Sequence, residues 1–123
     1  LPGVFQPVTI DNQVLVDGGT VNPVPYDLLL EECDIVIAID VIGRRSTPKA
    51  LTPGYFDTIF NAAKVMQQSI MTEKLRHRKP AIYIAPQILD VRTLEFYRAE
   101  EIFSQSLPAK QELKQRLTEL LAR

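Results

Sequence analysis

The stretch that decides the fold class is "DIVIAIDV", residues 34–41. This almost unbroken run of apolar, mostly β-branched residues is typical of a strand that is covered on both faces. A second run of the same kind, "AIYIAP", occupies residues 81–86. Between the two, apolar residues recur at steps of three and four from Tyr55 to about Lys79, which predicts an amphipathic helix. A strand, a helix and a strand in this order predict a parallel sheet in an α/β fold. The apolar face of the helix is formed by Ile59, Ala62, Ala63, Met66, Ile70 and Leu75.

Two more helices are predicted beyond the second strand. Pro80 ends the first helix, because proline lacks an amide hydrogen and restricts the residue before it. Residues 93–106 form the next helix, and Pro108 breaks the pattern. Residues 108–123 then form a terminal amphipathic helix. The apolar residues in line are Phe96, Ala99, Ile102 and Phe103 in the first of these helices, and Leu113, Leu117, Leu120 and Leu121 in the second.

The N-terminal side of the first strand predicts a β-hairpin and an irregular loop. In "VTIDNQVLV", residues 8–16, two β runs flank an Asp-Asn pair that tolerates the positive φ of a tight turn. The stretch "DGGTVNPVP", residues 17–25, has two glycines and two prolines and predicts irregular backbone. Residues 26–33 predict a short helix that Pro25 starts. Residues 42–54 are polar and predict a loop.

Length and composition limit the class of protein. A chain of 123 residues suits one domain. Its 14 basic and 15 acidic residues nearly balance, so there is no general electrostatic reason to expect nucleic acid as a partner. The single cysteine cannot form an internal disulfide, and no run of membrane-spanning length is present. We therefore expect a cytoplasmic or peripheral membrane protein.

The segment with the look of a site is Asp17-Gly18-Gly19, followed by Asn22-Pro23. A carboxylate at the end of a strand and ahead of two glycines can point into a crevice, because backbone without Cβ lets other groups approach. The competing interpretation is a plain turn, since Asp-Gly is a common turn dipeptide. We expect the carboxylate of Asp17 to lie in a crevice and to bond amides of its own loop, whereas a helix cap would favour the plain turn.

Three blocks in order resemble the C-terminal part of a patatin-like phospholipase domain. The first is "LPGVFQP", residues 1–7, the second is "VDGGTVNPVP", residues 16–25, and the third is the apolar run of residues 34–41. The second block is the most distinctive, whereas the third is mostly a general α/β pattern. The helices and strand beyond these blocks are consistent with the resemblance, but their sequence is less specific.

The resemblance implies a fold, a reaction and roles for the site residues. It implies that residues 1–123 are the C-terminal portion of a three-layer α/β/α sandwich that hydrolyses a lipid or other acyl ester with a Ser-Asp dyad and no cofactor. Asp17 then corresponds to the dyad base. Gly18 and Gly19 shape its turn, and Asn22 and Pro23 fix the loop that follows.

The chain departs from the family pattern in one respect. The family's nucleophile lies in a Gly-x-Ser-x-Gly motif and its oxyanion hole in a glycine-rich loop, both before the first block, and neither is present. We therefore expect a fragment that is inactive alone and exposes an apolar surface for its partner, either the N-terminal half of the domain or a second copy. The alternatives are a non-catalytic regulatory or protein-interaction module on the same scaffold and, ranked last, a flavodoxin-like binding domain.

Other polar residues have ordinary interpretations. His77 is the single histidine, so a Ser-His-Asp triad or a histidine-based metal cluster within this chain is not supported. At a helix end, a solvated cation is the expected role for it. The cations Arg44, Arg45 and Lys49 could meet an anionic head group, but a solvated loop is the stronger interpretation.

Overall fold

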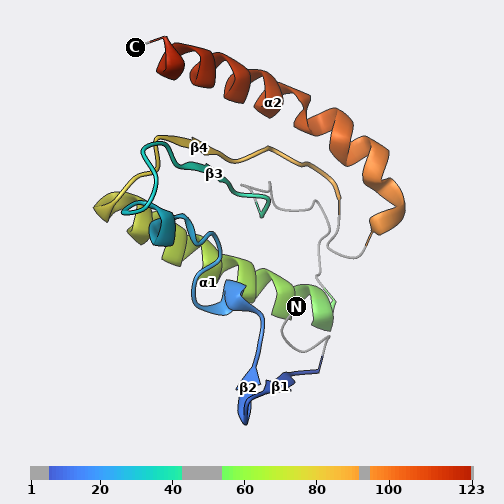
Figure 1. Ribbon diagram of the computed structural model, residues 1–123. Coiled ribbons are helices and arrows are strands. Elements are labelled where there is room, and N and C mark those ends of the chain that lie inside the picture. The colour runs from blue at the N-terminus through green and yellow to red at the C-terminus, as the bar shows by residue number, and fades with distance from the viewer. Residues whose placement is uncertain (1–5, 43–53, 92–94, 123) are drawn as a thin grey trace.

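The computed structural model describes residues 6–42, 54–91 and 95–122, and within them the chain is mixed α/β with two small sheets and two long helices (Figure 1). Most of the first sequence block, residues 1–5, and most of the predicted loop, residues 43–53, lie outside the described residues. The strands are β1 (Val8–Ile10), β2 (Gln13–Leu15), β3 (Ile37–Ile39) and β4 (Ile82–Ile84). The helices are α1 (Tyr55–His77) and α2 (Ala99–Leu121), with short 3-10 helices η1 (Gly18–Thr20), η2 (Tyr26–Leu29) and η3 (Phe96–Arg98).

The predicted hairpin is confirmed. Strands β1 and β2 pair antiparallel, with Val8 opposite Leu15. Asp11 and Asn12 connect them with φ values of 47° and 62°, the left-handed conformation that a two-residue hairpin turn requires. The hairpin extends away from the rest of the molecule (Figure 1), and all of its residues are exposed.

The predicted parallel pair is confirmed as well. Strand β3 pairs with β4 in parallel, with Ile37 opposite Ile82 and Ile39 opposite Ile84, and α1 lies between them in the chain. Both strands are shorter than their apolar runs, although the residues that flank β3 also bond β4. The amide of Ile82 donates to the carbonyl of Val36 at 3.3 Å, and the amide of Asp40 donates to the carbonyl of Ile84 at 2.8 Å. The two helices lie on opposite sides of this pair (Figure 1).

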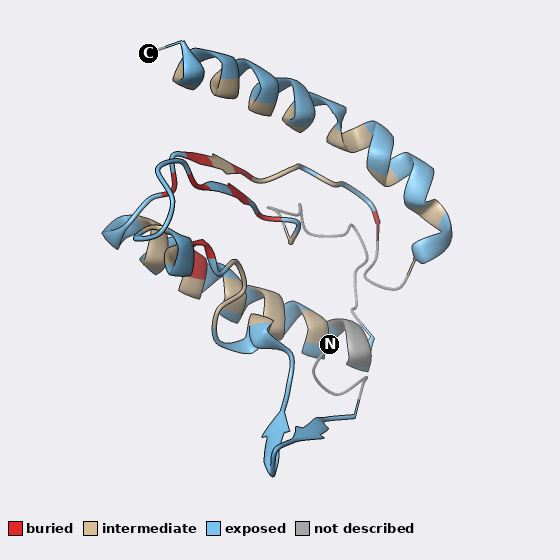
Figure 2. Ribbon diagram, in the orientation of Figure 1, coloured by how far each residue is buried: buried red, intermediate tan, exposed pale blue. Residues whose placement is uncertain are grey.

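The small core lies between the pair and α1. Burial alternates along β3, so that Val36 and Ala38 face α1 and pack with Met71 and with Tyr26 of η2. Figure 2 shows these buried positions along the two strands and in the segment beside α1. This alternation is the two-residue period of a strand with one covered face.

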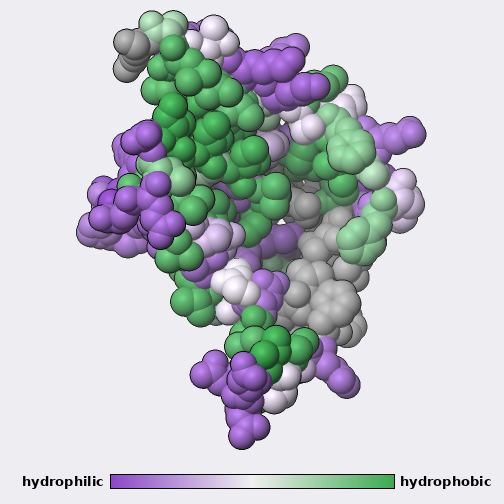
Figure 3. All heavy atoms as spheres, viewed as in Figure 1, coloured by the Kyte–Doolittle hydropathy of each residue, from purple (hydrophilic) through white to green (hydrophobic). Residues whose placement is uncertain are grey.

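The opposite face of the pair is covered over β4 but not over β3. Helix α2 packs along β4, where Ile82 and Ile84 are buried. On β3, Ile37 and Ile39 of the same face are 38% and 48% exposed. Hydrophobic side chains consequently gather at the surface between the two helices (Figure 3). The expectation that both runs are covered on both faces is therefore right for β4 and wrong for β3 within the described residues.

Helix α1 begins at Tyr55 as predicted and ends at His77, and only part of the predicted apolar face lies inward, since Ala63, Ile70 and Leu75 are half-buried. Its inner face includes the buried Met71 and the half-buried Gln67 and Lys74, whereas Ile59 and Met66 of the predicted face are 42% and 67% exposed. The hydrophobic pattern missed Gln67 and Lys74 because both are polar. These two side chains bond a loop that is distant in sequence.

Helix α2 continues through Pro108 as one helix, so the predicted break there is wrong. Residues 108–121 are helical, as expected of a terminal helix, but they continue from Ala99 without interruption. The half-buried positions recur at helical spacing on both sides of Pro108, and this common packing face holds the two halves in one helix. They are Ile102, Gln105, Ser106, Ala109, Leu113, Arg116, Leu117 and Leu120. Phe96 and Phe103, predicted to be on the apolar face, are 75% and 69% exposed.

The short helix predicted for residues 26–33 is the 3-10 helix η2, which begins at Tyr26 directly after Pro25. Across the described ranges, neither α1 nor α2 combines the length and the apolar character that crossing a membrane would require.

Candidate functional site

Asp17 lies two residues beyond the end of β2 and caps η1. Its backbone oxygen accepts bonds from the amide and the hydroxyl of Thr20, at 3.1 and 2.8 Å. The expected position just past a strand, in a turn that contains both glycines, is confirmed. The turn is nevertheless a cap on one 3-10 turn, which is the arrangement that favours the plain-turn interpretation.

The carboxylate of Asp17 is exposed and is held by its own loop. The amide of Gly19 donates to Oδ1 at 2.8 Å, as expected for bonding within the loop. This hydrogen bond favours the ionised form and lowers the pKa of Asp17 below its ordinary value. The group is therefore a directed but weakly basic carboxylate in the chain as described.

The two glycines have different roles. A Cβ on Gly19 would lie 2.8 Å from Nε2 of Gln67 and 3.1 Å from Oδ1 of Asp17, so a side chain here would displace the Gln67 amide and shift the Asp17 carboxylate. A Cβ on Gly18 would meet nothing within 4 Å. Both glycines lie in the turn, as expected, and their role in shaping it stays a prediction; a side chain would meet close neighbours at Gly19, whereas Gly18 borders open space.

Asn22 and the loop around it are fixed by Lys74 of α1. Nζ of Lys74 donates to Oδ1 of Asn22, donates to the carbonyl of Val24 at 2.7 Å and pairs with the carboxylate of Asp27. The side-chain Nδ2 of Asn22 donates to Oδ1 of Asp27 at 3.1 Å. The hydrogen bond from Lys74 is the main cause that lowers the pKa of Asp27.

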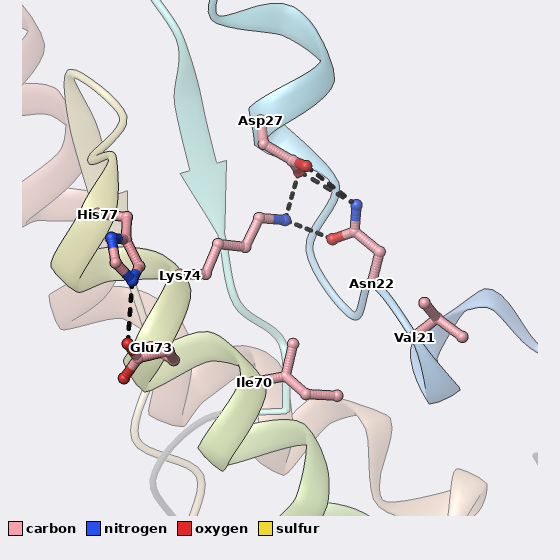
Figure 4. A pocket seen from close by; sticks show the side chains of 7 residues that line it. All are labelled: Val21, Asn22, Asp27, Ile70, Glu73, Lys74 and His77. Atoms are coloured by element: carbon pink, nitrogen blue, oxygen red, sulfur yellow. Dashed lines mark hydrogen bonds and ion pairs between the residues drawn. The ribbon is translucent and has the colours of Figure 1, made fainter.

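A shallow surface pocket lies beside this cluster (Figure 4). It is lined by Val21, Asn22, Asp27, Ile70, Glu73, Lys74 and His77. In Figure 4 the Lys74 side chain extends from α1 to meet Asp27 and Asn22, while His77 turns toward Glu73, 3.0 Å away. Asp17 is not among the residues that line this pocket, and the expected crevice around its carboxylate stays a prediction.

The structure brings Asp17, Gly18, Gly19 and Asn22 onto one loop that lies against α1, with Pro23 half-buried in the same loop. The sequence reasoning missed Gln67 and Lys74, which hold this loop. No local signal in the sequence marks them, because polar residues beside an apolar stripe ordinarily lie on the solvent side of a helix.

A second polar group that the sequence reasoning missed lies at the carboxyl end of β3. Asp40 is 8% exposed and accepts hydrogen bonds from the hydroxyl of Tyr83 at 2.7 Å and from the amide of Ile42 at 3.0 Å. An aspartate that ends a buried strand is a signal that could have found it. Its described bonds tie the end of β3 to β4.

Two serines of the helices, Ser69 in α1 and Ser106 in α2, have backbone partners. The hydroxyl of Ser69 donates to the carbonyl of Val65 at 3.0 Å, and that of Ser106 donates to the carbonyl of Phe103 at 2.7 Å. Such bonds to the preceding turn are the ordinary role of helical serines. Ser46, in the predicted loop of residues 42–54, lies outside the described residues together with Arg44, Arg45 and Lys49.

A search of the sequence against models of known protein families finds no match.

Proposed function

We propose that this chain is the C-terminal part of a patatin-like lipid acyl hydrolase and that Asp17 is the base of its Ser-Asp dyad. The observation that carries the proposal is the carboxylate of Asp17, placed just past a strand, oriented by the Gly19 amide and bordered at Gly18 by open space. The order of the three sequence blocks adds independent support.

The nucleophile and the oxyanion donors then come from residues outside this sequence. In the proposed reaction Asp17 accepts the proton of a serine hydroxyl while the serine oxygen attacks the ester carbonyl. The proton passes to the departing alcohol, and the acyl group stays on the serine. Asp17 next takes a proton from water, whose oxygen attacks the acyl-enzyme and releases the fatty acid, and the proton returns to the serine.

The low pKa of Asp17 sets a condition on this proposal. A carboxylate with a lowered pKa is a weak base, so the assembled site must remove water from it. The nucleophile-bearing segment would supply that cover by packing over the exposed side of the loop. The same packing of this segment would then complete the substrate site and raise the basicity of Asp17.

The exposed side of β3 supports a larger sheet. Within the described residues β3 pairs only with β4, and its Ile37 and Ile39 are largely uncovered. In the proposal, further parallel strands of the N-terminal half continue the sheet beside β3. The sheet becomes the middle layer of a three-layer sandwich, with α1 and α2 in the two outer layers. The protein would act in the cytoplasm or at a membrane surface, where lipid esters are available.

The alternative function is a non-catalytic regulatory or interaction module on the same scaffold. It is favoured by the cap that Asp17 forms on η1 and by the lack of a Gly-x-Ser-x-Gly motif in the sequence. Under this alternative Asp17 only stabilises its turn.

The test compares two aspartates in the protein that contains this chain together with the upstream nucleophile. Asp17→Asn should lower kcat for a short-chain acyl ester at least about a hundredfold, the usual scale for a positioned base. Asp11→Asn is the matched control, because Asp11 is exposed in the hairpin turn and asparagine accepts its positive φ. The 123-residue chain alone should show no turnover above background.

Two results would contradict the proposal. A change of less than about threefold for Asp17→Asn, too small for a positioned base, would favour the non-catalytic alternative. Turnover by the pure 123-residue chain that Asp17→Asn abolishes would show that the nucleophile lies within this sequence.

A further inference from the structure

Two polar side chains of α1 bond the segment of residues 17–27, called the Asp17 loop below. Gln67 and Lys74 are seven residues apart, which places them two turns apart on one face of the helix. Both are half-buried, and Lys74 retains 14% of its side-chain exposure. Met71 of the core lies between them on the same face.

Gln67 acts at the residue that orients Asp17. Its Nε2 donates to the carbonyl of Gly19 at 3.1 Å, while the amide of Gly19 donates to the carboxylate of Asp17 at 2.8 Å. Gly19 is thus held on its carbonyl side by α1 and holds Asp17 on its amide side. A rotation of Gly19 that lost the first bond would also redirect the second.

Lys74 fixes the other end of the same loop. It bonds Asn22, the carbonyl of Val24 and the carboxylate of Asp27, and its Nζ lies 4.6 Å from the ring centre of Tyr26. The ammonium group therefore has several directional partners within six residues of the loop. A point charge with three donors can hold a carbonyl, an amide oxygen and a carboxylate at once.

These contacts differ in kind from ordinary packing. An apolar residue at either position would also bury surface against the loop, but hydrophobic contact is non-directional, whereas hydrogen bonds require defined angles. Polar residues on the inner face of α1 therefore give the loop an orientation as well as an attachment.

We propose that Gln67 and Lys74 are positioning residues that set the direction of the Asp17 carboxylate from α1. This inference rests on the proposed function, because it gives the dyad base its support. It adds to that function two residues that touch neither substrate nor nucleophile and that act through Gly19 and Asn22.

The first experiment uses NMR on the 123-residue chain. Gln67→Met removes the donor with little change in volume, and Lys74→Met removes the charge and keeps much of the aliphatic stem. In both variants the Gly19 amide should exchange with solvent about fivefold faster or more, the effect of one lost hydrogen bond. The titration of the Asp17 carboxyl should also shift to higher pH, because the amide bond that lowers its pKa weakens.

Matched controls come from α2, on the other side of the sheet. Gln111→Met and Lys110→Met change the same residue types at exposed positions and should leave the exchange of Gly19 and the titration of Asp17 unchanged. Lys74→Arg retains a cation and should recover part of the slow exchange. If a methionine variant fails to fold, Gln67→Asn tests the same bond, since its shorter amide cannot reach Gly19.

The outcomes separate this inference from the proposed function. If neither Gly19 exchange nor the Asp17 titration changes in the Gln67 and Lys74 variants, the positioning role is wrong, whatever Asp17→Asn does to activity. If both change while Asp17→Asn leaves hydrolysis intact, α1 does orient the carboxylate and the dyad assignment fails. In an active protein, Gln67→Met should lower kcat about tenfold with little change in KM, as expected when a base is misplaced.

Discussion

Of the two glycines in the Asp17 loop, Gly19 has the less room for a side chain. Its missing Cβ allows Gln67 and the Asp17 carboxylate to lie on either side of one backbone segment. Gly18, its neighbour, borders open space. The two glycines thus offer a direct comparison between a glycine with close neighbours and one without.

We predict opposite effects for alanine at these two positions. Gly19→Ala should lower the free energy of unfolding by about 1 kcal/mol or more, because Gln67 must give up its hydrogen bond and Asp17 must shift. Gly18→Ala should be neutral or stabilising by about 0.5 kcal/mol, since alanine restricts the unfolded chain. Urea unfolding of both variants measures the difference, and equal values would show that Gln67 does not approach Gly19.

Helix α2 shows how packing overrides a local helix breaker. Pro108 has no amide hydrogen for the carbonyl four residues earlier, and its ring crowds the preceding turn. The helix nevertheless continues, because residues on both sides of Pro108 pack toward the same side of the sheet. Gln105 bonds both the amide and the carbonyl of Leu89, at 2.6 and 3.2 Å, and Arg116 donates to the carbonyl of Tyr83 at 3.0 Å. Anchors on either side of the proline hold the helix in place.

We predict that Pro108→Ala stabilises the protein. Alanine restores the missing hydrogen bond and removes the steric conflict, a gain of up to about 3 kcal/mol in a helix interior. The free energy of unfolding should therefore rise, and helical circular dichroism should not fall. Leu107→Ala, at an exposed neighbouring position, is the control and should have a small effect. A decrease in stability for Pro108→Ala would show that the proline is needed at this point of α2.

The whole molecule exposes much more surface than a compact protein of its size. Its accessible surface is 9764 Å², whereas a folded monomer of 13.9 kDa exposes about 6,700 Å². Part of the excess is apolar and continuous over β3, where Ile35, Ile37 and Ile39 are exposed on one face. Apolar surface of this kind is typical of a region that another chain or segment covers.

We predict that the isolated 123-residue chain self-associates through this face. Sedimentation should show species larger than a monomer as concentration rises, together with binding of a hydrophobic dye. Ile39→Lys should reduce both, because a charge on the β3 face opposes its burial. Val21→Lys, at an exposed apolar position away from the sheet, is the control. A monodisperse monomer without dye binding would contradict this expectation.

The sequence alone determined the local elements of this protein. The Asp-Asn pair predicted the hairpin turn, the two apolar runs predicted β3 and β4, and the periodicity before Pro80 predicted α1. These features follow from residues within a few positions of one another, since backbone conformation and side-chain periodicity are local properties. The position of Asp17 after a strand belongs to the same class.

Only the tertiary structure decided which faces are covered and what holds the Asp17 loop. Gln67 meets Gly19 across 48 residues and Lys74 meets Asn22 across 52, so no local pattern indicates that these polar side chains turn inward. The continuation of α2 through Pro108 likewise depends on packing against β4. The uncovered face of β3 depends on where α2 lies over the sheet. In each case the deciding free energy comes from partners distant in sequence, which outweigh the local preference of the residue concerned.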